Sequence, residues 1–166
     1  AAEPLGEGRY AINLSDRWWV GRGPNGGYVA ALVLRAMTSE AGLLDAAPLP
    51  ARSLNVHFLR PPTTGPAEIE VTVEHAGHVT AFLSARLIQD GEVKAKAMSV
   101  FSGEREGPSF DRSVMPEAPA PEDLEEMDTE QAPVAVFGRY RAKFIRGVPG
   151  EAGEKADTMG WIRLRD

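Results

Sequence analysis

Residues 24–37 read PNGGYVAALVLRAM, and this stretch decides the fold. After the paired glycines the residues are apolar on nearly every side until Arg35, and polar residues begin at Thr38. A helix that is apolar all round is normally buried all round. Gly42 is a natural stop, because glycine is common just after the last turn of a helix. The stretch predicts one buried helix that starts at the glycines and ends near Gly42.

The same region contains G-x-G-x-x-G, at Gly21, Gly23 and Gly26, which taken alone is the fingerprint of a dinucleotide-binding turn. That fold needs the turn to join a buried strand to a crossover helix, with further parallel strands and helices after it. Here Pro24 lies inside the motif, and the strands after Arg52 come in hairpin order. Parallel strands cannot be joined by a two-residue loop. The match is accidental, and no cofactor is expected.

Residues 53–102 are predicted to form antiparallel strands. AEIEVTVEH (67–75) alternates apolar and polar residues, as a strand with one buried face does. Asp90-Gly91 is a strong hairpin signal, and pairing Gln89 with Glu92 sets the register. The small residues on one face would let a helix approach closely, so this face is predicted to point inward: Phe82, Ser84, Arg86 and Ile88 beside Val93, Ala95, Ala97, Ser99 and Phe101. The face predicted to point outward carries Leu83, Leu87, Met98 and Val100.

Composition places the chain among ordinary globular proteins. Of its 166 residues, 43% are hydrophobic and 25% are charged. The net charge of -6 argues against general nucleic-acid binding, which needs a basic face. The absence of cysteine excludes disulfides, thiolate zinc sites and a cysteine nucleophile. No apolar run approaches the ~20 residues of a membrane span, and the first residues carry no signal pattern. A cytoplasmic protein is therefore expected.

The composition changes along the chain. Residues 1–102 are expected to form an α+β domain, and residues 103–133 are rich in Pro, Glu and Asp and are predicted to be a linker. Residues 134–166 contain two further strand-like pieces, AVFGRYRAKFIR and TMGWIRLRD.

Three segments together resemble the first half of the double hot-dog acyl-CoA thioesterases, in the thioesterase-like superfamily. They are PNGGYVAALVLRA, SLNVHFLRP and RLIQDGEVKAKAMSVF, in this order within residues 8–102. The resemblance implies a hot-dog fold, in which an antiparallel sheet wraps a central helix. Residues 134–166 resemble the opening strands of a second hot dog, which is then incomplete.

The resemblance also implies an activity, the hydrolysis of a fatty or otherwise hydrophobic acyl-CoA thioester to free acid and CoA by direct attack of water. The acyl chain would lie between helix and sheet. The acidic residue that positions water in this family is expected beyond Asp166. A homo-oligomer or a complementing hot-dog chain is the expected partner.

Four residues are candidates for catalysis. Asn25, Gly26 and Gly27 open the predicted helix, where free backbone N–H groups and the positive end of the helix dipole can hold a carbonyl oxygen. Equally, Asn25 is an ordinary helix cap and the glycines allow tight packing. His57 could orient water, although a lone histidine in a strand is more often structural.

Four more residues are candidates for substrate binding. Tyr28 follows the glycines, and Arg60 could pair with a CoA phosphate or form a surface ion pair. His78 and Thr80 come at the start of a predicted strand. His75 and His78 flank a turn without a third ligand, so no metal site is expected.

Two other classes of function stay open. A non-catalytic module that binds acyl-CoA or an acyl thioester, or that acts in assembly, needs no catalytic acid. A hot-dog hydratase or dehydratase of enoyl thioesters needs an Asp–His pair, for which His57 is the only candidate histidine.

Overall fold

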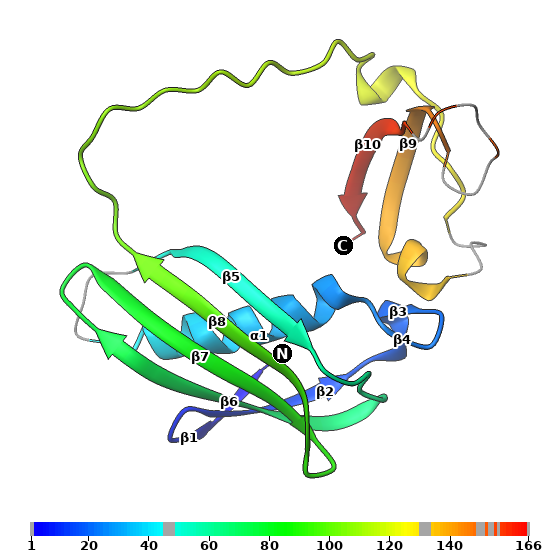
Figure 1. Ribbon diagram of the computed structural model, residues 1–166. Helices are drawn as coiled ribbons and strands as arrows, with labels where there is room; N and C mark the ends of the chain where they lie inside the picture. Colours follow the sequence, from blue (N-terminus) through cyan, green and yellow to red (C-terminus); the bar gives the residue numbers. More distant parts are fainter. Residues whose placement is uncertain are drawn as a thin grey trace. The chain divides into compact units, whose positions relative to one another are not determined.

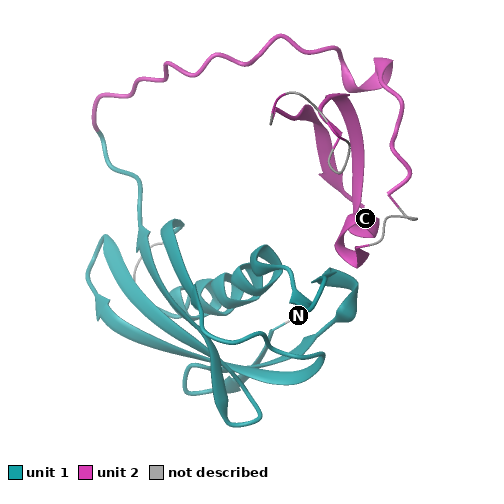
Figure 2. Ribbon diagram, turned by 45° about the vertical axis from the view of Figure 1, so that its right-hand side comes forward, with its two compact units in different colours: residues 1–106 teal, residues 107–166 magenta. Residues whose placement is uncertain are grey.

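The computed structural model describes residues 2–44, 49–129, 134–148, 152, 155 and 157–165. It divides the chain into two compact units, residues 1–106 and 107–166 (Figures 1 and 2). In the described residues no helix is long and apolar enough to cross a membrane.

The first unit is one helix packed on a six-stranded antiparallel sheet (Figure 1). The strands lie in the order β1-β2-β6-β7-β8-β5, and every neighbouring pair is antiparallel. The α+β hot-dog architecture is therefore confirmed. In chain order its elements are β1 (Glu3–Gly6), β2 (Arg9–Leu14), a 3-10 turn (Asp16–Trp18), β3 (Trp19–Val20), β4 (Gly23–Pro24), α1 (Gly26–Ala41), β5 (Ala51–Phe58), β6 (Gly65–Ala76), β7 (Thr80–Gln89) and β8 (Glu92–Ser102).

Helix α1 buries one face rather than its whole circumference. Val29, Val33 and Met37 are at most 2% exposed and belong to the same core as the inner face of the sheet. Ala31 is exposed and Leu32 is half-buried. The prediction of burial on all sides was too strong, because a single curved sheet covers a helix from one side only.

The hairpin of β7 and β8 departs from the predicted register at one residue. Gln89 lies opposite Glu92, as predicted, and Ile88 lies opposite Val93. The next pair is Leu87 with Ala95, so Lys94 is the extra residue of a β-bulge. Its carbonyl accepts hydrogen bonds from the amides of Leu59 (2.9 Å) and Arg60 (3.1 Å), just after β5.

This bulge reverses the two faces of β7. A shift of one residue moves every side chain of a strand to the opposite face. The prediction for β8 is confirmed beyond the bulge, since Ala95, Ala97, Ser99 and Phe101 are buried. Val93, which was also predicted to point inward, lies before the bulge opposite Ile88 and is only half-buried. The prediction for β7 was wrong. Its buried residues are Ala81, Leu83, Ala85, Leu87 and Gln89, whereas Phe82 and Arg86 are exposed.

The reversal of β7 is testable with two neighbouring truncations. Leu83→Ala should lower the free energy of unfolding by about 3 kcal/mol, because it leaves a cavity in the core. Phe82→Ala should lower it by about 1 kcal/mol or less, since the Phe82 ring is 40% exposed. Denaturant unfolding of both variants measures the difference. Equal losses, or a larger loss for Phe82→Ala, would contradict the observed register.

A hydrogen bond ties the last turns of α1 to the sheet. The buried Tyr10 hydroxyl on β2 donates to Oε2 of Glu40 at 2.7 Å. Burial, followed by the hydrogen bond and the charge of Glu40, raises the pKa of Tyr10 above its ordinary value. The folded state therefore favours the protonated hydroxyl.

Tyr10→Phe should lower the free energy of unfolding by about 1 to 2 kcal/mol at neutral pH, because a bond to a charged acceptor is lost. A raised folded-state pKa gives stability that is complete below about pH 10, the ordinary tyrosine pKa, and that is lost as the pH rises through the folded-state value. Denaturant unfolding between pH 7 and pH 11 should show the advantage of the wild type shrinking above pH 10. A difference that stays constant over this range would refute the assignment.

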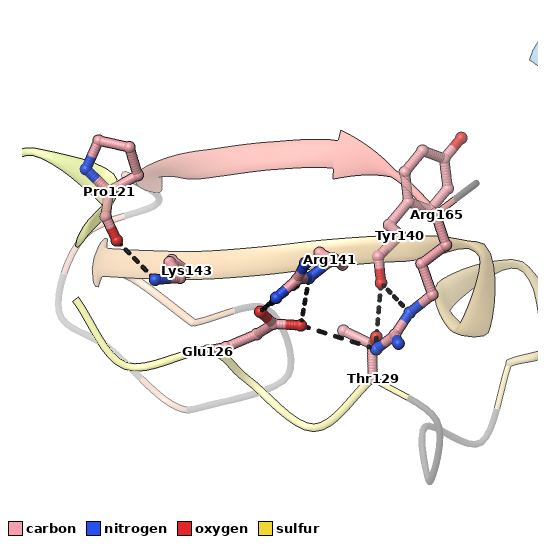
Figure 3. Close-up of polar contacts among 7 residues, drawn as sticks. All are labelled: Pro121, Glu126, Thr129, Tyr140, Arg141, Lys143 and Arg165. Carbon is pink, nitrogen blue, oxygen red and sulfur yellow. Dashed lines mark hydrogen bonds and ion pairs between the residues drawn. The ribbon is translucent and has the colours of Figure 1, made fainter.

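The second unit is built around a two-stranded antiparallel sheet. Its elements are 3-10 turns at Pro121–Asp123 and Ala135–Arg139 and the strands β9 (Tyr140–Arg146) and β10 (Met159–Leu164). Both strands were predicted. Figure 3 shows Arg141 and Arg165 on either side of the Glu126 carboxylate, with Lys143 donating to the carbonyl of Pro121. The hydrogen bond from Arg141, aided by the neighbouring cationic charges, holds the pKa of Glu126 below its usual range.

Candidate functional site

A short folded segment, residues 15–25, precedes α1 and is held by several contacts. The Asn25 amide donates to the carbonyl of Trp18 at 2.7 Å, across the β3–β4 hairpin. The Trp18 ring stacks on Tyr28, with ring centroids 5.4 Å apart and planes 4° from parallel. The Tyr28 hydroxyl accepts a hydrogen bond from the Ser15 amide (3.2 Å). These contacts fix the position and direction of the first helical turn.

Two amides in the first turn of α1 have no acceptor among the residues that the structure describes. Asn25 is the cap, and its Oδ1 accepts from the Tyr28 amide at 3.2 Å. Its carbonyl accepts from the Val29 amide, also at 3.2 Å. The amides of Gly26 and Gly27 make no hydrogen bond to any residue that the structure describes. Both lie at the positive end of the helix dipole, so they form a potential site for a carbonyl oxygen or an anion.

A mainly apolar hollow of about 380 Å³ borders this turn, and we call it the helix-start hollow. Apart from one arginine, it is lined by side chains without charge. Its lining residues are Gly23, Pro24, Gly26, Val29, Phe58, Leu59, Arg60, Pro61 and Pro62. Apolar hollows with a few polar groups are the usual form of small-molecule sites. From the sequence, only Arg60 of this stretch was a candidate for binding. Phe58 and Leu59 were taken as the end of a strand, although two apolar residues just before Arg60 and the proline pair were visible there.

Close contacts explain both glycines of the turn. A Cβ atom at Gly26 would lie 3.2 Å from Cζ of Phe58, at the wall of the hollow. A Cβ atom at Gly27 would lie 3.0 Å from Oδ1 of Asn25, the atom that caps the helix. Larger residues would therefore displace the Phe58 ring or disturb the cap.

Arg60 lies in the wall of the helix-start hollow and forms an ion pair. Its Nη1 is 2.9 Å from Oε1 of Glu92, and Nζ of Lys94 is 2.8 Å from the other oxygen. The hydrogen bond and charge of Lys94, followed by Arg60, hold the pKa of Glu92 below its usual range. Tyr28, by contrast, packs on Trp18 and does not line the hollow.

His57 lies on the other face of the sheet. It alternates with Phe58 along β5 and is exposed directly opposite Lys96 of β8. The structure therefore separates His57 from the glycine turn by the thickness of the sheet, because successive residues of a strand point to opposite faces.

His78 and Thr80 lie at the far end of the unit. Thr80 starts β7 opposite Ser102, and its Oγ1 accepts a hydrogen bond from Arg105 at 3.1 Å. This is the end of the sheet where β5 begins, whereas Phe58 ends β5 beside Gly26 (Figure 1). Eight strand residues separate the two ends by about 23 Å. Of the predicted residues, the structure thus brings Asn25, Gly26, Gly27 and Arg60 together at the hollow. Tyr28 shares the helix turn, but its ring packs on Trp18 instead.

Within the described ranges, no group of three histidine, aspartate or glutamate side chains could hold a metal ion.

One helix packed in a six-stranded antiparallel sheet is the architecture of a hot-dog protein. A family model for the acyl-CoA thioesterase N-terminal domain matches residues 14–102, which is more than half of the chain. The chain belongs to this family. None of the curated proteins matches the sequence.

Solved structures resemble the chain over most of its length. A conserved protein of unknown function with a hot dog fold from Alicyclobacillus acidocaldarius is 29% identical, with a TM-score of 0.84 over 99% of this chain and 60% of that one. An acyl-CoA thioesterase II from Mycobacterium marinum is 23% identical, with a TM-score of 0.71 over 100% of this chain and 59% of that one. A protein from Bacillus halodurans, solved with CoA, is 20% identical, with a TM-score of 0.55 over 61% of this chain and 70% of that one. The chain spans about 60% of the length of the first two.

The cap at Asn25 gives a testable prediction. Asn25→Ala should lower the free energy of unfolding by about 1 kcal/mol, because the Tyr28 amide loses its acceptor. Asn25→Asp should keep most of the stability, since a carboxylate also caps and suits the positive end of the helix. Denaturant unfolding compares the two variants. Equal losses for Ala and Asp would show that Asn25 acts by some other contact.

Proposed function

We propose that this chain holds the thioester carbonyl in an acyl-CoA thioesterase, which releases a free acid and CoA. The observation that carries the proposal is that the amides of Gly26 and Gly27 bond to no described residue and lie on the border of the mainly apolar helix-start hollow. Membership of the acyl-CoA thioesterase N-terminal domain family supports the same chemistry.

The reaction needs donors where negative charge develops. Attack of water on the acyl carbon moves electrons onto the carbonyl oxygen, and fixed N–H groups stabilise that oxyanion. The amides of Gly26 and Gly27 are the donors in this proposal, aided by the dipole of the 16-residue helix α1. The C–S bond then breaks, and the CoA sulfur leaves as a thiolate that takes up a proton. The chain contains no cysteine that could form an acyl-enzyme through sulfur.

The acyl group is placed in the helix-start hollow. Further along α1 the space between helix and sheet is filled by side chains, since Val33 and Met37 are at most 1% exposed and Leu83 is fully buried. The hollow beside Phe58 offers apolar surface next to the free amides instead. Arg60 stands at its wall, where a CoA phosphate could compete with Glu92 for the guanidinium.

The group that positions the water comes from elsewhere in this proposal. No aspartate, glutamate or histidine is among the residues that line the hollow. The chain spans about 60% of the similar solved chains, so a longer chain, a second copy or a complementing hot-dog chain can supply that group.

The same lack of an acid or base in the hollow favours a second candidate function. A module that binds acyl-CoA without cleaving it needs the apolar surface and the amides but no water-activating group. His57 lies on the opposite face of the sheet, so its position argues against enoyl hydratase or dehydratase chemistry at the helix-start hollow.

A matched pair of variants at Gly26 tests the role of its amide. Gly26 is the first residue of α1, a position where proline is tolerated, and Gly26→Pro removes the N–H group. Gly26→Ala adds a Cβ atom at the same place and keeps the N–H group. If the amide holds the oxyanion, Gly26→Pro should release thiol from acyl-CoA about a hundredfold more slowly than Gly26→Ala. A coupled thiol-release assay over a panel of acyl chain lengths measures both rates.

Gly107→Ala is the control, because a Cβ atom there meets nothing within 4 Å. Equal rates of thiol release by folded Gly26→Pro and Gly26→Ala would show that the Gly26 amide does not stabilise the oxyanion. Saturable acyl-CoA binding without thiol release would favour the binding module over the hydrolase when it is found for the longer chain or the assembled oligomer, which contains the group that positions the water.

A further inference from the structure

A row of basic side chains crosses the outer face of the sheet, the face opposite α1. His57 of β5 lies directly opposite Lys96 of β8, and Lys96 lies directly opposite Arg86 of β7. Like charges directly opposite each other destabilise a sheet. Arg86 has a counter-ion, since its Nη2 is 2.5 Å from Oε2 of Glu70. The side chains of His57 and Lys96 form no hydrogen bond or ion pair with the residues described, so Lys96 is a cation without a counter-ion.

A hollow of about 600 Å³, which we call the outer hollow, starts at this row. Beyond the basic row its surface is largely uncharged. Met98 is 55% exposed, and Val100 and Asn55 also line it. Lys96, Met98 and Val100 are alternate residues of β8, so the hollow runs about 13 Å along one strand from its basic end. It is therefore cationic at one end and uncharged along its length, where Met98 and Val100 lie beside the polar side chains of Ser53, Asn55 and Ser84.

We propose that the outer hollow binds a linear carboxylate with an apolar chain, such as a fatty acid. The carboxylate lies against Lys96, between His57 and Arg86, and supplies the missing negative charge. The chain lies along Met98 and Val100 and covers apolar surface that is otherwise exposed. The ligand is chosen by charge and length, because one basic row followed by an uncharged strand face matches one anionic group on an apolar tail.

This site is distinct from the helix-start hollow, which lies at the start of α1 beside Phe58. The inference rests on the proposed function in one respect, namely that a free acid of this kind is the product of the hydrolysis. It gives that product a binding place outside the site where it forms. It also gives a role to His57, which points away from the glycine turn.

Dodecanoate is the probe, titrated into the full chain by calorimetry. The wild type should bind it saturably, and Lys96→Gln should weaken the binding about fivefold or more, the size of one partly exposed ion pair. Arg35→Gln is the matched control, because it removes one positive charge from the exposed side of α1 and should leave the affinity unchanged. Dodecan-1-ol, which has the same chain without the charge, should bind more weakly than dodecanoate. Lys96→Gln should also keep or raise the melting temperature, since it relieves the repulsion from Arg86.

Three results would each overturn the inference: no saturable binding of dodecanoate, equal binding by Lys96→Gln and the wild type, or equal binding of dodecan-1-ol. Concentration-dependent dimers that Met98→Asp dissolves, with no effect of dodecanoate, would show instead that a second copy covers this face. Thiol release is measured separately. Dodecanoate binding that depends on Lys96, in a chain that releases no thiol, would support the acid site while the proposed hydrolysis failed. Thiol release without such binding would leave the hydrolysis standing and reject the acid site.

Discussion

The contact between α1 and the inner face of the sheet is the interaction on which the rest of the first unit depends. Val29, Val33 and Met37 are buried in one core with Leu83 and Phe101. Each fully buried side chain of this size contributes about 1.5 to 3 kcal/mol. The helix can approach the centre of the sheet because β8 presents small residues there, Ala95, Ala97 and Ser99. The helix axis, and with it the place where the helix begins, is set by this packing.

Because the core fixes the helix, it also fixes the free amides at its start. The glycine turn lies against Phe58, and the bulge at Lys94 accepts hydrogen bonds from the amides of Leu59 and Arg60 just beyond it. The helix-start hollow is thus held by the helix on one side and by the end of β5 on the other. The same alternation along β5 that puts Phe58 in this hollow puts His57 on the opposite face, where the basic row lies. The helix-start hollow and the outer hollow therefore lie on opposite faces of the same strand, β5.

The candidate site was predictable only in its local part. The sequence indicated the helix start, since Asn25 and two glycines precede an apolar run, and capping is a matter of neighbouring residues. The grouping of His57, His78 and Thr80 with that turn was not predictable. Whether they meet depends on which face a strand residue takes and at which end of the sheet it lies. Thr80 begins a strand at the end of the sheet opposite Phe58, and no property of the residues around Thr80 encodes that distance.

Several features followed from the sequence alone: the helix, its stop at Gly42, the alternation of β6 from Ile69 to Val73 and the tight turn at Asp90-Gly91. Each depends on interactions between residues close together in the chain. The sequence also determined which face of β8 turns inward, through the small side chains on that face. The face of β7, in contrast, depends on a contact between distant parts of the chain. The bulge at Lys94 inserts one residue into the ladder, and its carbonyl is held by amides that lie about 35 residues earlier in the chain. The alternation of apolar and polar residues does not show that such a partner exists. One contact with a distant part of the chain was therefore enough to place every side chain of β7 on the face opposite to the predicted one.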